Sequence, residues 1–200
     1  ADYEKAISLD PNNETAKRNL AIITADKGGG GVKKESGVLD LSGERWNWFD
    51  PKADASYETS GGSILMRAPK GNGLWPTTNF DAPRLTKEVT GDFTLQTRLR
   101  GNWATDYNGS GLTVHVGRSS VIRFERGING FGIPGQHIAL LGFVDGRETG
   151  RGHIMFSNTD LYLRLERKGN DFTGFVSSDG ANWQRVAAVT VRFPETVNAG

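Results

Sequence analysis

Two glutamates on predicted strands are the first candidates for acid–base chemistry. Cleavage of a glycoside with retention needs two carboxyl groups about 5 Å apart, and residues spaced by two or four along a strand share one face. Glu125 and Glu166 instead each have an arginine on both sides within two residues. Neighbouring guanidinium groups lower the pKa of a carboxyl group, which is the wrong direction for a general acid. We therefore expect cross-strand ion pairs here and predict that the protein is not an enzyme, with a glycosidase as the less favoured alternative.

Histidine and cysteine give no transition-metal site in this sequence. The chain has no cysteine, which excludes thiolate zinc sites, iron–sulfur clusters and a cysteine nucleophile. None of His115, His137 and His153 lies at metal-ligand spacing from another histidine or from a carboxylate. We expect structural histidines, and the position of His115 on a polar strand face would let that side chain line a groove.

Oxygen ligands suitable for calcium are few. Asp106, Asn108 and Asp145 could coordinate the ion, but the sequence has no contiguous Asp/Asn ladder of the EF-hand type. Gly130–Gly135 matches a dinucleotide-binding glycine pattern, yet a predicted strand follows it where a helix should begin. We predict no cofactor, with calcium as a less favoured alternative.

The tryptophans give the strongest functional lead. Trp75 and Trp103 lie in segments that also contain Asn and Asp residues. Sugar rings stack on aromatic faces, while amide and carboxylate side chains bind the hydroxyl groups. A role in the hydrophobic core is the alternative for both residues, and it is the favoured role for Trp46 and Trp48. The predicted ligand-binding residues are Trp75, Arg98, Trp103, Asn108, His115, Arg123 and Glu125.

The segments that must position these residues follow the two-residue period of β-strands. Apolar and polar residues alternate over 93–100, 112–116 and 161–166, which is typical of antiparallel strands with one buried face. Ile138–Val144 is almost continuously apolar, as expected for a strand covered on both faces. With the Gly-, Asn- and Asp-containing turns between them, these segments predict an all-β sandwich of roughly ten or eleven short strands.

Several of these segments carry recognisable motifs. The order of Gly91-Asp92-Phe93, Gly111–Val114, Ile122–Glu125, Leu163–Gly169 and Ser177–Trp183 resembles concanavalin A-like domains, and within them the regulation-of-enolase-like group. That group is similar to modules appended to bacterial glycosidases. The resemblance implies a jelly-roll sandwich of two curved antiparallel sheets, often associated with sugar binding, over residues 38–200.

The Ser177–Trp183 motif is expected to be structural. It resembles a shortened Asp-box hairpin, in which Asp179 accepts backbone hydrogen bonds and Gly180 has a positive φ. Trp183 would pack beneath the turn.

Two departures from the family pattern limit what the resemblance implies. Related domains continue past the position of Val197–Gly200, so we expect that an edge or central strand is missing at the C-terminus. Many relatives carry Ser-Asp-Trp where this sequence has Asp145–Gly152. A ligand role of that segment therefore does not transfer to this chain.

The N-terminal region has a different character. Tyr3, Ala6, Pro11 and Leu20 follow an order that resembles the end of one tetratricopeptide repeat and the start of the next, so residues 1–26 are expected to form a short helical hairpin. Because such arrays need roughly three repeats to be stable, we expect more repeats upstream. Residues 27–37 form a Gly-rich linker.

Composition excludes several classes of partner. The formal net charge is +1, without the basic excess of a nucleic-acid-binding protein. No apolar run approaches the roughly 18 residues of a membrane span. The compartment stays open, with a secreted or periplasmic one slightly favoured. We predict a non-catalytic, carbohydrate-binding module attached to a repeat region that binds protein, and a protein-binding or structural scaffold is the alternative.

Overall fold

The computed structural model describes residues 37–41, 43–60 and 62–200. The helical hairpin expected at residues 1–26 lies outside the described residues, as does the linker at 27–37 except for its last residue. Every element in the described part is a β-strand, and all paired strands run antiparallel. The predicted all-β class is therefore confirmed. The estimate of ten or eleven strands is too low, because the described residues contain sixteen.

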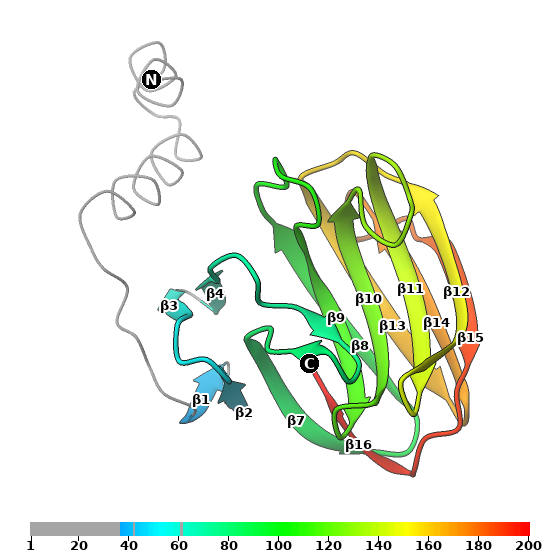
Figure 1. Ribbon diagram of the computed structural model, residues 1–200, viewed down its shortest axis with the longest axis horizontal. Helices are drawn as coiled ribbons and strands as arrows, with labels where there is room; N and C mark the ends of the chain where they lie inside the picture. Colours follow the sequence, from blue (N-terminus) through cyan, green and yellow to red (C-terminus); the bar gives the residue numbers. More distant parts are fainter. Residues whose placement is uncertain (1–36, 42, 61) are drawn as a thin grey trace.

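Two sheets form the body of the molecule and lie one behind the other (Figure 1). The larger sheet has eight strands in the order β1 (Gly37–Leu41), β2 (Glu44–Phe49), β7 (Arg84–Thr90), β16 (Thr196–Ala199), β9 (Gly109–Val116), β10 (Ser120–Ile128), β11 (Gln136–Val144) and β12 (Arg147–Met155). The smaller sheet has four, in the order β15 (Gln184–Thr190), β14 (Asp171–Ser177), β13 (Asp160–Lys168) and β8 (Phe93–Arg100).

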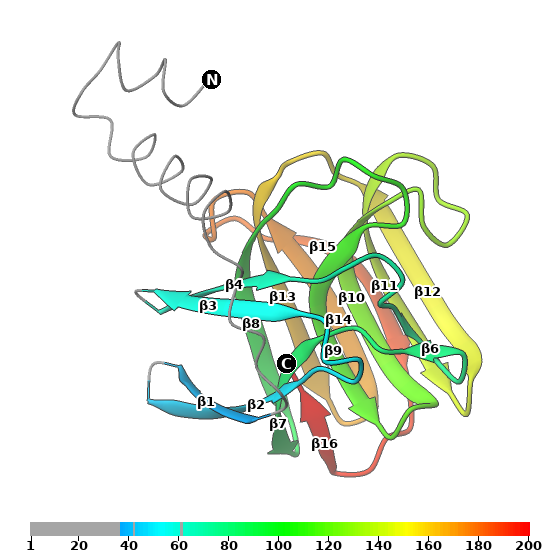
Figure 2. The same cartoon turned by 60° about the vertical axis from the view of Figure 1, so that its left-hand side comes forward.

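Two short hairpins accompany the sheets. β3 (Ser56–Ser60) and β4 (Ser63–Arg67) lie to one side of the sandwich, near β1 and β2 (Figure 2). β5 (Leu74–Trp75) and β6 (Asn79–Phe80) lie against the large sheet, on the face away from the small sheet. We call that face the outer face.

Packing follows the alternation seen in the sequence. The main core lies between the sheets and contains inward-facing side chains such as Ile122, Phe124 and Leu163, all fully buried. A second cluster on the outer face joins Val121, Leu141 and Phe143 to Phe80 of β6. β11 therefore has apolar packing on both faces, and the prediction for Ile138–Val144 is confirmed. No helix in the described ranges has the length and hydrophobicity to cross a membrane.

The last residues of the sequence lie inside the large sheet. β16 pairs with β7 on one side and β9 on the other, and Gly200 exchanges two backbone hydrogen bonds with Thr113, of 2.7 and 2.9 Å. In the described part, the eight strands of this sheet therefore form a continuous ladder. The Asp145–Gly152 segment supplies the turn before β12 and its first residues.

Candidate ligand-binding site

The outer face of the large sheet brings several polar predicted residues together. Along β10, Ile122 and Phe124 point into the main core, so Arg123 and Glu125 point to the outer face. His115 on β9 is paired with Val121 of β10 and lies on the same face. Strand register thus places three of the seven predicted residues on one surface.

An aromatic pair borders this surface. The rings of Trp75 and Phe131 are stacked with centroids 5.8 Å apart and planes 19° apart, and Phe143 meets Trp75 edge-on at 5.4 Å. Trp75 is 41 % exposed although it packs on two rings. An exposed aromatic ring held in position by other rings can receive the apolar face of a ligand at little entropic cost.

Beneath the aromatic pair lies an ion pair. Arg123 donates two hydrogen bonds to Glu125 Oε2, of 2.7 and 3.1 Å, and both side chains are 13 % exposed. The guanidinium carbon lies 4.8 Å from the ring centroid of Phe131 and 5.8 Å from that of Trp75. Glu125 therefore pairs within its own strand, rather than across strands as the sequence suggested. The site therefore combines an ion pair of opposite charges with two aromatic rings in contact with its guanidinium group.

The loop that carries Phe131 is tied at its base. The Asn129 N–H donates to the Gly135 carbonyl at 3.0 Å, and the Gly135 N–H donates to the Asn129 side chain. Asn129 also donates to Asp106 at 2.6 Å, which joins this loop to the one before β9. Phe131 itself has a φ of +57°, a conformation that the sequence gives no reason to expect at a phenylalanine.

His137 lies under this loop, at the start of β11, and is completely buried. Its Nδ1 lies 3.1 Å from the Gly135 carbonyl, which can accept but not donate, so the ring proton belongs on Nδ1. Nε2 is then an acceptor, and it is buried without a hydrogen-bond partner. Burial lowers the pKa of His137, which keeps the ring neutral.

His115 is covered rather than open. The ring of Phe80 lies edge-on to it at 5.6 Å, and both ring nitrogens are buried without a partner. Burial, helped by the nearby charge of Arg84, lowers the pKa of His115 to about 4. The β5–β6 hairpin therefore separates His115 from the surface around Trp75.

Arg98 and Trp103 lie elsewhere, and Asn108 lies at the end of β9 that is next to Glu125. Arg98 is on the small sheet, where it makes a two-bond ion pair with Asp160 at 2.8 Å and faces Tyr162. Trp103 is 4 % exposed and packs in the main core. Asn108 precedes β9 and donates to the carbonyl of Asn102 at 3.3 Å. Residues that the sequence did not single out for binding complete the outer-face site: Phe131 and His137.

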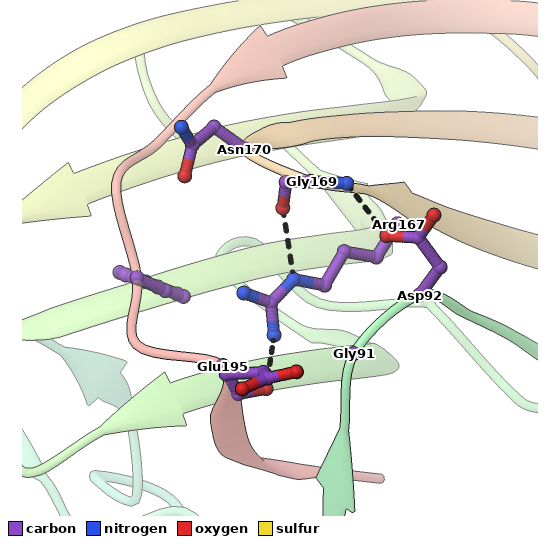
Figure 3. A pocket seen from close by; sticks show the side chains of 7 residues that line it. Gly91, Asp92, Arg167, Gly169, Asn170 and Glu195 are labelled. Carbon is purple, nitrogen blue, oxygen red and sulfur yellow. Dashed lines mark hydrogen bonds between the residues drawn. The ribbon is translucent and has the colours of Figure 1, made fainter.

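A pocket of about 300 Å³ lies where β8 begins and β13 ends, at the other end of these strands from the Arg98–Asp160 ion pair. Its lining includes Gly91, Asp92, Arg167 and Glu195 (Figure 3). Arg167, 4 % exposed, donates to the carbonyls of Gly169, Pro194 and Glu195 at 2.7–3.0 Å. Its hydrogen-bonding capacity is thus used to hold two turns together. We interpret this pocket as structural.

Metal ligands do not gather in the described part of the chain. No group of three or more His, Cys, Asp or Glu side chains there is arranged to hold an ion. Asp106, one of the residues considered for calcium, accepts the hydrogen bond from Asn129 described above. Asp179 accepts backbone hydrogen bonds from Ala181 and Asn182 at 2.8 Å, and Gly180 has a φ of +77°, which confirms the predicted hairpin geometry.

Comparison with known proteins supports the fold. No protein-family model and no curated protein matches the sequence. The structure is similar to that of a functionally unknown protein from Saccharomyces cerevisiae, with a TM-score of 0.55 and 16 % identity over 84 % of this chain and 82 % of that one. It also matches a carbohydrate-binding module, CBM66, from Bacillus subtilis, with a TM-score of 0.37 and 11 % identity over 82 % and 83 % of the two chains. At 16 % identity, the likeness to the yeast protein concerns the fold alone.

Proposed function

We propose that residues 38–200 form a non-catalytic, concanavalin A-like jelly-roll domain that binds carbohydrate on the outer face of its large sheet. One observation carries the proposal: the exposed ring of Trp75 is stacked on Phe131 directly beside the Arg123–Glu125 ion pair. A flat aromatic surface can stack on the C–H groups of a sugar ring, and the fixed charged groups beside it can form hydrogen bonds with the hydroxyl groups.

The polar groups of the site support binding rather than hydrolysis. Glu125 is held by Arg123 at 2.7 Å, and Glu148 of β12 is held by Arg151 at 3.0 Å. Both carboxylates near the aromatic pair are thus engaged by guanidinium groups, whereas a glycosidase needs a carboxyl group free to give up a proton. Arg151 also donates to the Phe131 carbonyl at 3.0 Å, which supports the loop that carries the ring.

The domain organisation follows the sequence interpretation. Residues 1–26 are proposed to end a tetratricopeptide region that binds a protein partner, and residues 27–37 to link it to the sandwich. The ligand of the sandwich is a glycan or a similar extended molecule. In this arrangement the repeats bind the protein partner, and the outer face of the sandwich binds the glycan.

Binding to a glycan array, followed by calorimetric titration of any ligand found, tests the proposal. Trp75→Ala should weaken binding by tenfold or more, which corresponds to about 1.4 kcal/mol. Trp183→Ala is the matched control, because that ring packs under Arg164 on the small sheet, with the guanidinium carbon 3.8 Å from the ring centroid. It should leave binding unchanged.

Two results would count against carbohydrate binding. The first is the absence of any glycan ligand on the array. The second is a loss of affinity that is equal for Trp75→Ala and Trp183→Ala. Recovery of a protein ligand whose affinity depends on Trp75 would support the scaffold alternative instead.

A further inference from the structure

Tyr107, in the turn before β9, is held in a conformation that the packing of the protein does not explain. It is 82 % exposed, the highest value among the large hydrophobic residues of the described part. Its φ is +61°, in a region that is unfavourable for a bulky residue. Within the described part, the ring contacts no other ring or cation, and the hydroxyl has no hydrogen-bond partner. Backbone outliers of this kind gather at binding sites, so we looked for a ligand that this ring could contact.

Hydrogen bonds fix Tyr107 relative to the aromatic pair of the proposed carbohydrate site. The Tyr107 N–H donates to the carbonyl of Ile128, the last residue of β10, at 2.9 Å. The hydrogen bond of 2.6 Å between Asn129 and Asp106 joins the same turn to the loop that carries Phe131. Both aromatic residues therefore have backbones held in place before a ligand arrives, which lowers the entropic cost of binding.

The distance between the two positions exceeds the size of one sugar ring. The Phe131 ring lies over Arg123 of β10, with the guanidinium carbon 4.8 Å from the ring centroid, whereas Tyr107 is bonded to Ile128 of the same strand. At about 3.3 Å per residue, Arg123 and Ile128 are roughly 16 Å apart along the strand. A chain of several sugar units could contact both aromatic residues.

The strand surface between the two positions carries no protruding side chains on β9. Gly111 is opposite Glu125 in the register of β9 and β10, and Gly109 is opposite Gly127. Gly109 and Gly111 are both exposed, so the backbone of β9 is open to solvent there. Glycines within a strand often mark places where a ligand approaches the backbone closely. A sugar chain could therefore follow β9 and β10 from the aromatic pair to Tyr107.

We propose that Tyr107 is a second aromatic contact of the carbohydrate site, and that the ligand is an extended glycan chain bound along β9 and β10 from Trp75 and Phe131 to Tyr107. This inference rests on the proposed carbohydrate binding and adds the length and the path of the ligand. One aromatic pair is sufficient for a single sugar or a chain end, whereas two separated aromatic contacts favour a long chain.

The test is isothermal titration calorimetry of the full chain with linear oligosaccharides of glucose, galactose, mannose, xylose and fructose, each from the disaccharide to the hexasaccharide. In at least one series the hexasaccharide should bind at least tenfold more tightly than the disaccharide. Tyr107→Ala should weaken hexasaccharide binding by tenfold or more and change disaccharide binding by less than twofold, because only the longer chain reaches the second ring. Tyr107→Phe keeps the ring and should retain both affinities.

Met155→Ala is the matched control for the path of the chain. Met155 is 58 % exposed and ends β12, on the outer face but on the other side of β11 from β10 and β9. A hexasaccharide that followed β12 would lose affinity in this variant, whereas the proposed path predicts no change. Trp75→Ala should weaken the binding of the disaccharide and of the hexasaccharide, since both contact the aromatic pair.

NMR of wild-type protein with isotope-labelled tyrosine rings gives a readout that a purely structural role of Tyr107 would not produce. The Tyr107 resonance is assigned by its absence from the spectrum of Tyr107→Phe. It should shift when the hexasaccharide is added and stay fixed when the disaccharide is added.

The outcomes separate the two proposals. Equal affinities for the disaccharide and the hexasaccharide, or hexasaccharide binding that Tyr107→Ala leaves unchanged, overturn the inference. A loss of affinity in Met155→Ala that equals or exceeds the loss in Tyr107→Ala overturns it too. In each of these cases, binding that Trp75→Ala weakens leaves the proposed function standing. If no probe binds, both the inference and the proposed function fall.

Discussion

The guanidinium carbon of Arg126 lies 4.8 Å from the ring centroid of Trp103, inside the sandwich. The ring also occupies the space left by Gly101, where a Cβ would approach within 2.9 Å of it. Trp103 is therefore a core residue that is placed by a buried cation and a glycine. Trp75, which stood beside it as an equal candidate in the sequence, reaches the surface instead.

The contrast between the two tryptophans predicts losses of stability of different size. Trp103→Ala should lower the free energy of unfolding by about 3 kcal/mol, because it leaves a cavity in the core. Trp75→Ala should cost about 1 kcal/mol, since the ring is 41 % exposed. Urea denaturation followed by circular dichroism measures both. Equal losses of stability would contradict the assignment of the two rings.

The sequence could not separate these two residues, for a physical reason. Periodicity reports which face of a strand is buried, and the continuous apolar run Ile138–Val144 correctly indicated that both faces of β11 are covered. Trp103 lies in the irregular segment between β8 and β9, where no period exists and burial depends on contacts with distant residues. A tryptophan among Asn and Asp residues has the same sequence signature in a core as at a binding site.

Arginine positions show a second limit of the sequence. Arg98 and Arg123 both occupy polar positions of alternating strands, but β8 belongs to the small sheet and β10 to the large one. Alternation fixes the face of a strand relative to its own sheet, and it does not say which strands are neighbours. Phe131 lies in a glycine-rich loop, and the position of its ring depends on a positive φ and on hydrogen bonds within the loop. Neither can be predicted from the pattern of residue types.

The two arginines lead to a prediction about binding. Arg123→Ala should weaken carbohydrate binding on the order of tenfold, because it removes both the partner of Glu125 and the cation facing Phe131. Arg98→Ala should leave affinity unchanged and have little effect on stability, as expected for an exposed ion pair. Isothermal titration calorimetry of both variants measures the two affinities. An equal loss of affinity in both would show that the ligand does not bind at Arg123.

Arg167 supports a prediction about the structural pocket. Its three donor nitrogens reach the carbonyls of Gly169, Pro194 and Glu195, which a lysine ammonium could not satisfy together. Figure 3 shows the hydrogen bonds to Gly169 and Glu195. Arg167→Lys should therefore lower the free energy of unfolding by about 2 kcal/mol. Arg185→Lys, at an exposed position of β15, is the control and should change it by less than about 0.5 kcal/mol. A stable Arg167→Lys variant would refute the role of the guanidinium.

His115 predicts how stability depends on pH. Burial, with Arg84 nearby, lowers its pKa in the folded protein to about 4, while the unfolded chain keeps the usual value of 6.5. The unfolded state thus binds more protons between these values, and stability is full above pH 6.5 and falls as the pH drops toward 4. The residue as a whole is only partly buried, so the loss is on the order of 2 kcal/mol, less than the whole pKa shift implies.

A variant separates His115 from the other titrating groups. His115→Phe removes two unpaired ring nitrogens and keeps a ring against Phe80, so stability at pH 7 should be equal or higher. Between pH 7 and pH 4 this variant should lose about 2 kcal/mol less than the wild type. His137, whose pKa is also lowered by burial, is present in both proteins and cancels in the difference. Urea denaturation at several pH values gives this difference directly, and parallel pH profiles would show that His115 is protonated equally easily in the folded and unfolded states.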